Sequence, residues 1–483
     1  MAPQSDPKVD RPVNSPTKPE KQRAELGLWD AVSVIVGIVV GVSIFKVPPV
    51  VFGNVGAPWE GLAVWVVGGV VALLGALCYG ELATTYPGFG GDYVYLTHAY
   101  GPSAGFLFAW TRLTTIQTGN IAALSYVFAD YAVRLFGCQP RDAVWFAAAA
   151  VVAVTVFNIL GLRSGKSLQN LLTVAKVAGL TGLLAIGFWK GNMASWQASE
   201  PAAGPGIGLA MILVLYAYGG WNDAALVTAD VHEPRRNMPR ALILGTLLVT
   251  ALYLLVNVAF VHALGFSGIR GSRAPAADVF GLALGAQGAA GMSLLVMVSA
   301  LGGVSGLILT GSRLHASLGA DYRIFGWMGH WNARLNSPIR SLVVQGCVSL
   351  LLIVGVGTDW GRDSIDRALS AIGLSPLPWV QYEGGFDTLV AGTSPIFWLF
   401  FLLTAISLLV LRVRDRARPR PFTTPLYPLV PLVFIAACGY MLYASVAYAR
   451  ALCLLGIIPL LIGIPLFLVS GRTQGSGEAS SHG

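Results

Sequence analysis

The chain has 483 residues, of which 55% are hydrophobic and 11% charged, and its mean hydropathy is +0.67. This composition excludes an ordinary water-soluble protein, because many apolar stretches are long enough to meet the roughly 20 residues that a membrane-spanning helix needs. The net charge of +8 does not indicate nucleic-acid binding, since 20 of the 31 basic residues fall on one side of the expected topology, 8 on the other and 3 within helices. That asymmetry follows the positive-inside rule and predicts a multi-pass protein of the cell membrane with cytoplasmic N- and C-termini.

The apolar segments, taken in chain order, predict an all-α polytopic membrane protein with twelve transmembrane helices. Residues 1–25 are rich in Pro, Lys and Ser and lack the apolar region of a signal peptide, so we interpret them as a disordered cytoplasmic tail. Residues 26–412 form the predicted core, 413–470 the last two helices and 471–483 a C-terminal tail. The predicted spans are about 28–50, 59–84, 103–133, 142–162, 169–190, 206–230, 239–264, 277–312, 338–356, 388–411, 426–448 and 451–470.

Glycine interrupts the first and the sixth span at matching places. Gly41 lies about 13 residues into the first span and Gly219 about 13 residues into the sixth. Each glycine weakens a helix by roughly 1 kcal/mol relative to alanine. Unwound backbone at this depth is tolerated only where it is buried in protein or lines a cavity. The alternative explanation is close packing of helices at small residues. The matching positions favour an inverted repeat of five plus five spans with a binding site at the breaks.

Five sequence motifs between residues 26 and 470 carry a family resemblance. Together they resemble the amino acid–polyamine–organocation (APC) transporters, and most closely the L-type amino acid transporter branch. The resemblance implies a LeuT-like fold with discontinuous helices 1 and 6. It also implies amino acid transport by alternating access, as an exchanger (antiporter) or as a proton-coupled symporter. The motifs begin at Val34 (VIVGIVVGVSIF), Cys78 (CYGELATTYPGFGGDY), Tyr216 (YAYGGWN), His232 (HEPRRNMPR) and Pro421 (PFTTPLYPLVP).

Unwound helices can bind a zwitterionic amino acid without charged side chains. Amides at the start of a half-helix point at an anion, and carbonyls at the end of a half-helix face a cation. We therefore assign the substrate carboxylate to Gly41, Val42 and Ser43. The family has Gly-Ser-Gly here, so the Ser43 side chain should narrow the carboxylate site or donate its hydroxyl. We assign the ammonium to the carbonyls of Gly37, Ile38, Tyr216, Ala217 and Gly219.

Aromatic and amide side chains flank the second break. Tyr218 and Asn222 are further candidates for substrate binding, and Trp221 is a weaker one. Each could instead be an ordinary core residue.

Lys176 lies in the middle of the fifth span. An ammonium at the bilayer centre costs about 2.5–3.5 kcal/mol on insertion scales, so it must face protein or water. The resemblance places a lysine here, where related sodium-coupled transporters hold an ion between spans one, five and eight. We expect the Lys176 ammonium to replace that ion, to bridge the segment near Gly37 to span eight, and to be able to release a proton during transport. Snorkelling is the alternative, but Lys176 is far from either end of its span.

Three acidic residues are candidate gating groups: Glu81, Asp92 and Asp230. Glu81 could pair with a cytoplasmic arginine. Cys138 lies in a loop that resembles an outer loop of L-type light chains, where a cysteine bonds a single-span heavy chain. The loop is two residues shorter here, and we interpret Cys138 as a free cysteine rather than a link to a partner. The insertion at about 357–386 is expected outside the membrane.

Two other functions stay open on the sequence alone. A polyamine or amine transporter should add carboxylates near the ammonium site, where only Asp223 is available. A transporter-like amino acid sensor usually needs a long signalling domain. The sequence has no GxxxxGK[ST] phosphate-binding loop. It also lacks a Ser/His/Asp set or a metal-ligand cluster at one depth. We therefore predict no enzyme activity, no cofactor and no metal, and as partners only the substrate, membrane lipids and protons.

Overall fold

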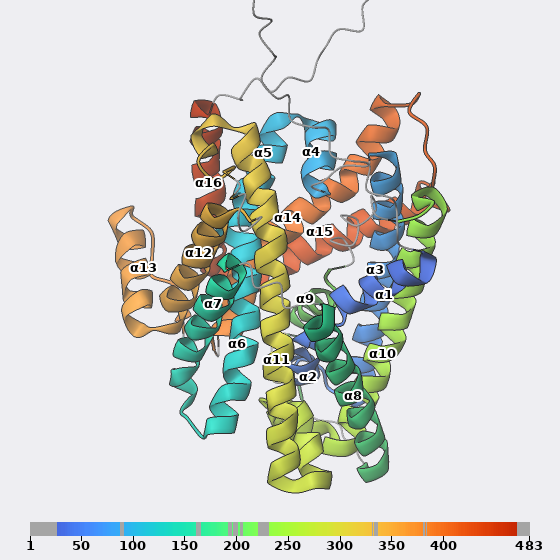
Figure 1. Cartoon of the computed structure of the whole chain (residues 1–483), viewed down its shortest axis with the longest axis vertical. Helices are drawn as coiled ribbons and strands as arrows, with labels where there is room; N and C mark the ends of the chain where they lie inside the picture. The colour runs from blue at the N-terminus through green and yellow to red at the C-terminus, as the bar shows by residue number, and fades with distance from the viewer. Residues whose placement is uncertain are drawn as a thin grey trace, which may run out of the picture.

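The computed structural model is a bundle of helices and describes residues 27–86, 91–160, 166–191, 196, 201–202, 206–220, 231–330, 332, 337–379, 382 and 384–470 (Figure 1). Within these ranges seven helices are long and apolar enough to cross a membrane, which makes this a polytopic, all-helical protein. Twelve crossings and the five-plus-five repeat stay predictions. The seven are Pro58–Thr85, Pro140–Ile159, Arg236–Gly271, Pro275–Ala316, Ile339–Gly357, Gly385–Arg414 and Leu429–Val469.

Helices occupy the apolar segments in chain order. Short 3₁₀ turns (η1, η3, η6 and η8) and one π-helical turn (η2) lie between or within them. The elements are α1 (Leu28–Val39), η1 (Val42–Phe45), α2 (Val47–Gly53), α3 (Pro58–Thr85), α4 (Asp92–Tyr100), α5 (Pro102–Thr111), η2 (Arg112–Ile116), α6 (Gln117–Phe136), η3 (Pro140–Asp142), α7 (Ala143–Ile159), α8 (Lys166–Lys190), α9 (Ile207–Ala217), α10 (Pro234–Gly271), α11 (Pro275–Asp321), η6 (Arg323–Phe325), α12 (Ile339–Gly357), α13 (Asp359–Ala371), α14 (Gly385–Arg414), α15 (Leu429–Ala449), η8 (Arg450–Cys453) and α16 (Leu454–Val469).

The first span is interrupted within the segment that the glycines indicate. Helix α1 ends at Val39, Val40 has non-helical ψ of 75°, and Gly41 is extended at φ −90° and ψ −167°. The chain then forms the turn η1 before α2 begins. Gly37, however, lies inside α1, so the break begins later than this glycine. A single glycine lowers helix stability by too little to end a helix by itself.

The sixth span also stops at its glycines. Helix α9 ends at Ala217, and a turn follows in which the Gly219 amide donates to the Tyr216 carbonyl at 3.1 Å. Gly220 has φ of +107°, a conformation that L side chains rarely adopt, so glycine is required at this position. Residues 221–230 lie outside the described part of the chain, and with them Trp221, Asn222, Asp223 and Asp230.

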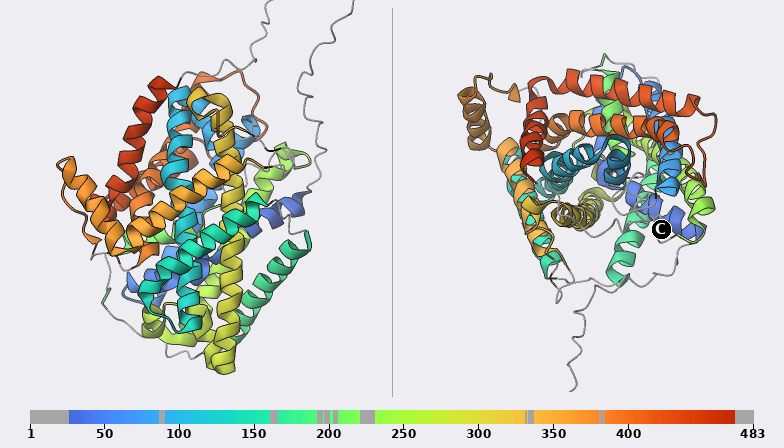
Figure 2. Two further views of the ribbon diagram at one scale, coloured as in Figure 1. Left: turned by 60° about the vertical axis from the view of Figure 1, so that its left-hand side comes forward. Right: turned by 90° about the horizontal axis from the view of Figure 1, so that it is seen from above.

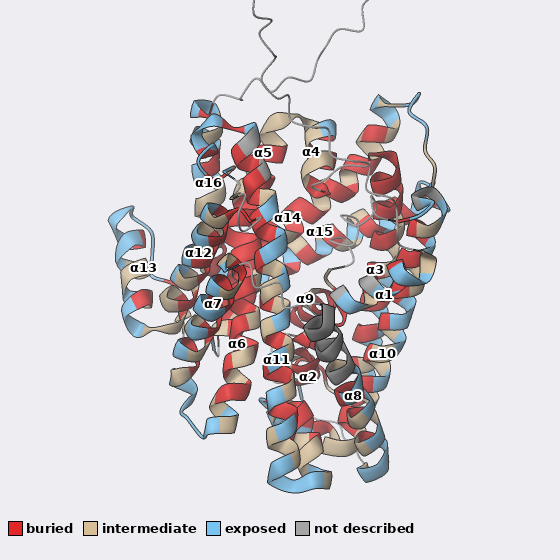
Figure 3. Cartoon of the chain, viewed as in Figure 1, coloured by how far each residue is buried: buried red, intermediate tan, exposed pale blue. Residues whose placement is uncertain are grey.

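Packing brings both interrupted segments into the interior. Helix α10 contacts α1, α3 and α8, while α9 contacts α2, α3 and α15. α3, α1 and α10 lie on one flank, and α6, α7 and α12 on the other (Figures 1 and 2). Buried residues concentrate in the middle of the bundle, whereas many outward faces are exposed (Figure 3), and the exposed residues include many large apolar side chains.

The insertion at 357–386 contains a helix that the sequence analysis did not predict. Helix α13 begins after Thr358, whose hydroxyl accepts a hydrogen bond from the Gly361 amide at 2.9 Å. A threonine N-cap of this kind is a readable start signal. The helix stands at the edge of the bundle beside α12 (Figure 1).

Candidate substrate site

One tyrosine joins the two helix breaks. The hydroxyl oxygen of Tyr253, on α10, lies 2.8 Å from the Val39 carbonyl oxygen and 3.1 Å from the Ala217 carbonyl oxygen. Val39 is the last residue of α1 and Ala217 the last of α9, and Tyr253 is fully buried. A hydroxyl has one proton, so the two carbonyls share this donor. The ends of both half-helices therefore meet at a single side chain.

Lys176 contacts the first break directly. Its Nζ donates a hydrogen bond of 3.0 Å to the Val40 carbonyl, three residues beyond Gly37. Helix α8 contributes this ammonium from the side of the bundle where it packs on α10 and α11. Among the described residues, Lys176 has no carboxylate partner. The positive charge thus faces the backbone carbonyls at the end of α1.

The backbone carbonyls and amides assigned to the substrate differ in whether they already have a hydrogen-bond partner in the backbone. An α-helix that ends at Val39 leaves late carbonyls, including those of Gly37 and Ile38, without a helical partner. The Gly41 amide donates to the Val39 carbonyl at 2.7 Å. A 3₁₀ turn that starts at Val42 leaves the amides of Val42 and Ser43 without one. Of the three amides predicted to bind the carboxylate, those of Val42 and Ser43 are therefore the ones left for it, because the Gly41 amide is used within its own turn.

Close packing does not explain the glycines at the breaks. A Cβ on Gly37 would meet nothing within 4 Å, and one on Gly41 or Gly219 would meet only atoms of its own turn, none closer than 3.0 Å. By contrast, a Cβ on Gly68 would lie 2.3 Å from Val214 Cγ1, and one on Gly69 would lie 2.6 Å from Thr250 Cγ2. These two glycines of α3, which the sequence did not single out, thus allow close helix packing, whereas the glycines at the breaks do not serve it.

An aromatic and charged cluster covers one side of the breaks. The rings of Tyr216 and Phe386 stack edge to face with centroids 5.8 Å apart, and the buried Tyr216 hydroxyl has no hydrogen-bond partner among the described residues. The Lys46 ammonium lies 5.8 Å from the Phe386 centroid and 2.6 Å from the Asp130 carboxylate. The sequence alone did not predict this cluster. Lys46 could have been found as an ionisable residue inside an apolar span, whereas no feature of the sequence distinguishes Phe386 from other core aromatics.

Tyr218 points toward α3. Its hydroxyl donates to the Trp65 carbonyl at 3.1 Å, and its ring packs against the rings of Trp65 and Tyr253. Its side chain therefore supports the helix packing beside the break, and its substrate contact stays a prediction.

Glu81 is buried in an ion-pair network where α3 and α14 end. It accepts hydrogen bonds from the Arg412 guanidinium, with Nε at 2.7 Å, and from the Thr424 amide at 2.7 Å, and Arg420 lies 3.6 Å away. The pairing with an arginine after span ten is thus present, while the gating role stays a prediction.

Two other acidic groups accept hydrogen bonds from tyrosines in the last turns of α3 or directly after it. Asp92 accepts from the Tyr79 hydroxyl at 2.6 Å, and Asp415 accepts from the Tyr86 hydroxyl at 2.7 Å. Burial, and after it the hydrogen bond to Asp415, raises the pKa of Tyr86 to about 12, so Tyr86 stays a donor at neutral pH. Asp230, the third predicted gating residue, lies outside the described residues.

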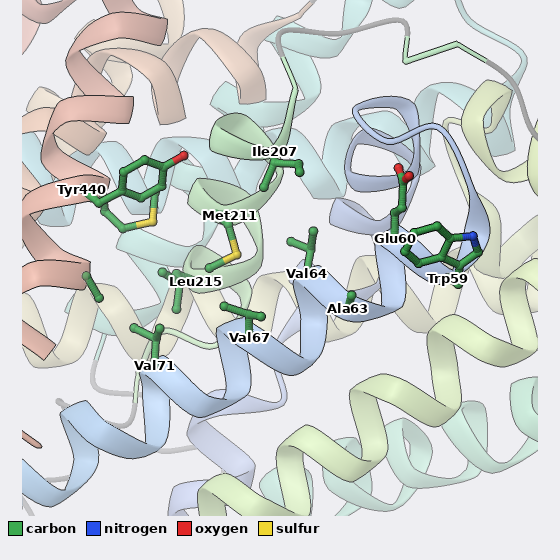
Figure 4. Close-up of a pocket in the computed structure, with 12 residues that line it drawn as sticks. Trp59, Glu60, Ala63, Val64, Val67, Val71, Ile207, Met211, Leu215 and Tyr440 are labelled. Atoms are coloured by element: carbon green, nitrogen blue, oxygen red, sulfur yellow. The ribbon is translucent and has the colours of Figure 1, made fainter. Parts of the chain in front are cut away.

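Two further features lie away from the breaks. An apolar groove of about 530 Å³ runs between α3, α9 and α15, and it contains none of the predicted substrate residues (Figure 4). Cys138 is exposed and free; the other four cysteines are also free, and Cys78, Cys438 and Cys453 are buried. The described residues contain no group of three or more His, Cys, Asp or Glu side chains that could hold a metal.

Comparison with known proteins identifies the class of this protein. The family described as "Amino acid permease" matches residues 26–454, and the chain belongs to this family of membrane transporters, whose members are not enzymes. The b(0,+)-type amino acid transporter 1 of Homo sapiens is 30% identical over 434 residues, which is 87% of this chain and 82% of that protein.

Two other relatives are similar over a comparable length. The Asc-type amino acid transporter 1 of Mus musculus is 30% identical over 460 residues, or 92% of this chain and 81% of that protein. The large neutral amino acids transporter small subunit 2 of Mus musculus is 30% identical over 463 residues, again 92% of this chain and 81% of that protein.

Proposed function

We propose that this protein is a secondary active transporter that moves amino acids across the cell membrane by alternating access. The observation that carries the proposal is the position of Tyr253, whose hydroxyl reaches the last residue of both interrupted half-helices. Two helix ends at one point present carbonyls to a cation, and the start of η1 presents amides to an anion. This arrangement suits the two charges of one α-amino acid.

The substrate in this proposal lies along the two breaks. Its carboxylate binds the amides of Val42 and Ser43. Its ammonium binds carbonyls at the ends of α1 and α9, which include those of Gly37, Ile38, Tyr216, Ala217 and Gly219. Its side chain extends toward α6, α11 and α14.

Lys176 takes the place of a bound cation in this proposal. Its ammonium on the Val40 carbonyl stabilises the unwound segment without sodium. Loss and gain of its proton would supply coupling in a symporter, whereas an exchanger needs only its fixed position.

The orientation and the assembly are also proposals. The excess of basic residues on one side supports cytoplasmic termini.

One relative is by its name a small subunit. We propose that Cys138 forms no disulfide to a partner chain, because its loop is shorter than the one it resembles.

Purified protein in liposomes tests the function. A panel of radiolabelled amino acids is offered with and without internal amino acid, and with and without an inward proton gradient. Uptake that requires internal amino acid identifies an exchanger, and uptake driven by the gradient alone identifies a symporter. Binding without uptake under every condition would instead support a sensor, and uptake of polyamines alone would support an amine transporter.

A further inference from the structure

The groove between α3, α9 and α15 is a concave part of the protein's lateral surface. Its lining on α3 is Ala63, Val64, Val67 and Val71, and these face Met211 and other apolar side chains of α9 (Figure 4). Its volume of about 530 Å³ is within the range of roughly 300–1,000 Å³ typical of ligand pockets.

The groove opens toward the surface that membrane lipid covers. Val66, Val67 and Val70 on α3 are 44%, 51% and 51% exposed, and Tyr443 on α15 is 71% exposed. On a membrane span, apolar side chains exposed in this way face acyl chains rather than water. We therefore expect a lipid acyl chain to occupy an apolar groove at this surface.

One end of the groove is polar. Glu60 and Trp59 lie in the first turn of α3, and Trp59 is 65% exposed. Helix α3 has 28 residues, which at about 1.5 Å per residue exceeds the roughly 30 Å of hydrocarbon. A helix of this length extends beyond the hydrocarbon, and because tryptophan is enriched at the level of the lipid head groups, we place its first turn, with Trp59, at that level.

Glu60 gives this end a negative charge and a free acceptor. One carboxylate oxygen accepts a hydrogen bond from the Gly56 amide at 2.7 Å, and this is its one partner among the described residues. The other oxygen is left for a cationic donor. A carboxylate at this position attracts an ammonium head group and repels an anionic one.

We propose that this groove is a binding site for one phosphatidylethanolamine molecule, with an acyl chain between α3, α9 and α15 and its ammonium on Glu60. The site does not depend on the proposed transport activity. It includes Met211 and Leu215, which precede Tyr216 on α9, so the lipid stabilises the helix that carries the second break.

Native mass spectrometry of the full chain tests the site. The protein is transferred from nanodiscs that hold equal amounts of phosphatidylethanolamine and phosphatidylglycerol, and the retained lipid is identified. Val67→Trp fills the groove, while Val66→Trp places the same side chain on the same helix outside the lining. We expect wild type and Val66→Trp to retain one phosphatidylethanolamine, and Val67→Trp to retain at least about tenfold less, equivalent to ~1.4 kcal/mol of binding free energy.

Glu60→Gln tests the head group separately. We expect this variant to keep a lipid but to lose the preference for phosphatidylethanolamine over phosphatidylglycerol. As a second readout, added phosphatidylethanolamine should raise the melting temperature of wild type and of Val66→Trp but not of Val67→Trp, because a ligand stabilises the state that binds it. Equal retention by the two tryptophan variants, an unchanged preference in Glu60→Gln, or a dimer mass lost in Val67→Trp in place of lipid would overturn the proposal.

Discussion

The Lys176 ammonium donates a 3.0 Å hydrogen bond to the carbonyl of Val40, the residue at which α1 stops being helical. A charged side chain from the middle of α8 thus donates to a carbonyl that has no partner within helix α1. The same break is held from α10 by Tyr253, so two different helices fix its geometry.

Replacing Lys176 tests the support of the first break. We expect Lys176→Ala to insert and fold but to reduce uptake by at least about tenfold, or ~1.4 kcal/mol, because the Val40 carbonyl loses its donor. Initial uptake rates in liposomes measure the effect. Lys190→Ala is the control, since Lys190 ends the same helix and lies over the Trp189 ring at 4.3 Å. Normal transport by Lys176→Ala would refute the role.

Tyr253→Phe removes only the hydroxyl shared by the two breaks. We expect a loss of stability of about 1–3 kcal/mol from the buried carbonyls left without a donor, together with reduced uptake. Tyr382→Phe is a matched control, because its hydroxyl also lies near two carbonyls, of Tyr448 at 2.7 Å and Ala449 at 3.0 Å, away from the breaks. Thermal melting and uptake are measured for both. If Tyr382→Phe impairs uptake equally, the effect of Tyr253 is one of stability alone.

Ser43 lies at the proposed carboxylate site, where the family resemblance implies a glycine. We expect Ser43→Gly to change substrate affinity or range, because it widens the space beside the amide of residue 43. Ser43→Ala keeps most of the side-chain volume but removes the hydroxyl. Its competition profile should resemble that of wild type if the volume of the side chain matters. It should resemble that of Ser43→Gly if the hydroxyl donates to the substrate. Competition of labelled uptake by a panel of unlabelled amino acids measures both. An unchanged competition profile for Ser43→Gly would count against this position.

Glu81 tests the buried network where α3 and α14 end. Glu81→Gln should destabilise the protein by about 3–5 kcal/mol, because it leaves the Arg412 guanidinium without its buried partner. Glu81→Gln combined with Arg412→Met should recover part of that loss, as measured by thermal melting. Additive losses in the double variant would mean that the two side chains do not act as a pair.

Cys138 tests the assembly. We expect Cys138→Ser to leave uptake and the migration on a non-reducing gel unchanged, since Cys138 is free in the monomer and is proposed to bond no partner. Membranes of the native host are the material for the gel. A higher-mass band that Cys138→Ser abolishes would show a disulfide-linked partner instead.

The site was partly predictable from the sequence. Gly41 and Gly219 indicated where the two spans stop being helical, although Gly37 proved to lie within α1. That Lys176 must face protein or water was predictable, because the cost of an ammonium at mid-membrane depth does not depend on which helices surround it; its role in transport stays a prediction. Tyr253 carried no such signal, since a tyrosine in an apolar span is most often a core residue.

The sequence by itself determined the membrane class, the order of the apolar helices and the places where two of them break. These follow from hydropathy, helix propensity and charge, which act on each segment separately. The tertiary structure decided that Tyr253 joins the breaks, that Lys176 donates to the Val40 carbonyl, and that Tyr218 faces Trp65. Such contacts join helices far apart in the chain, and the helical period fixes which side chains share a face but not which helix lies opposite them.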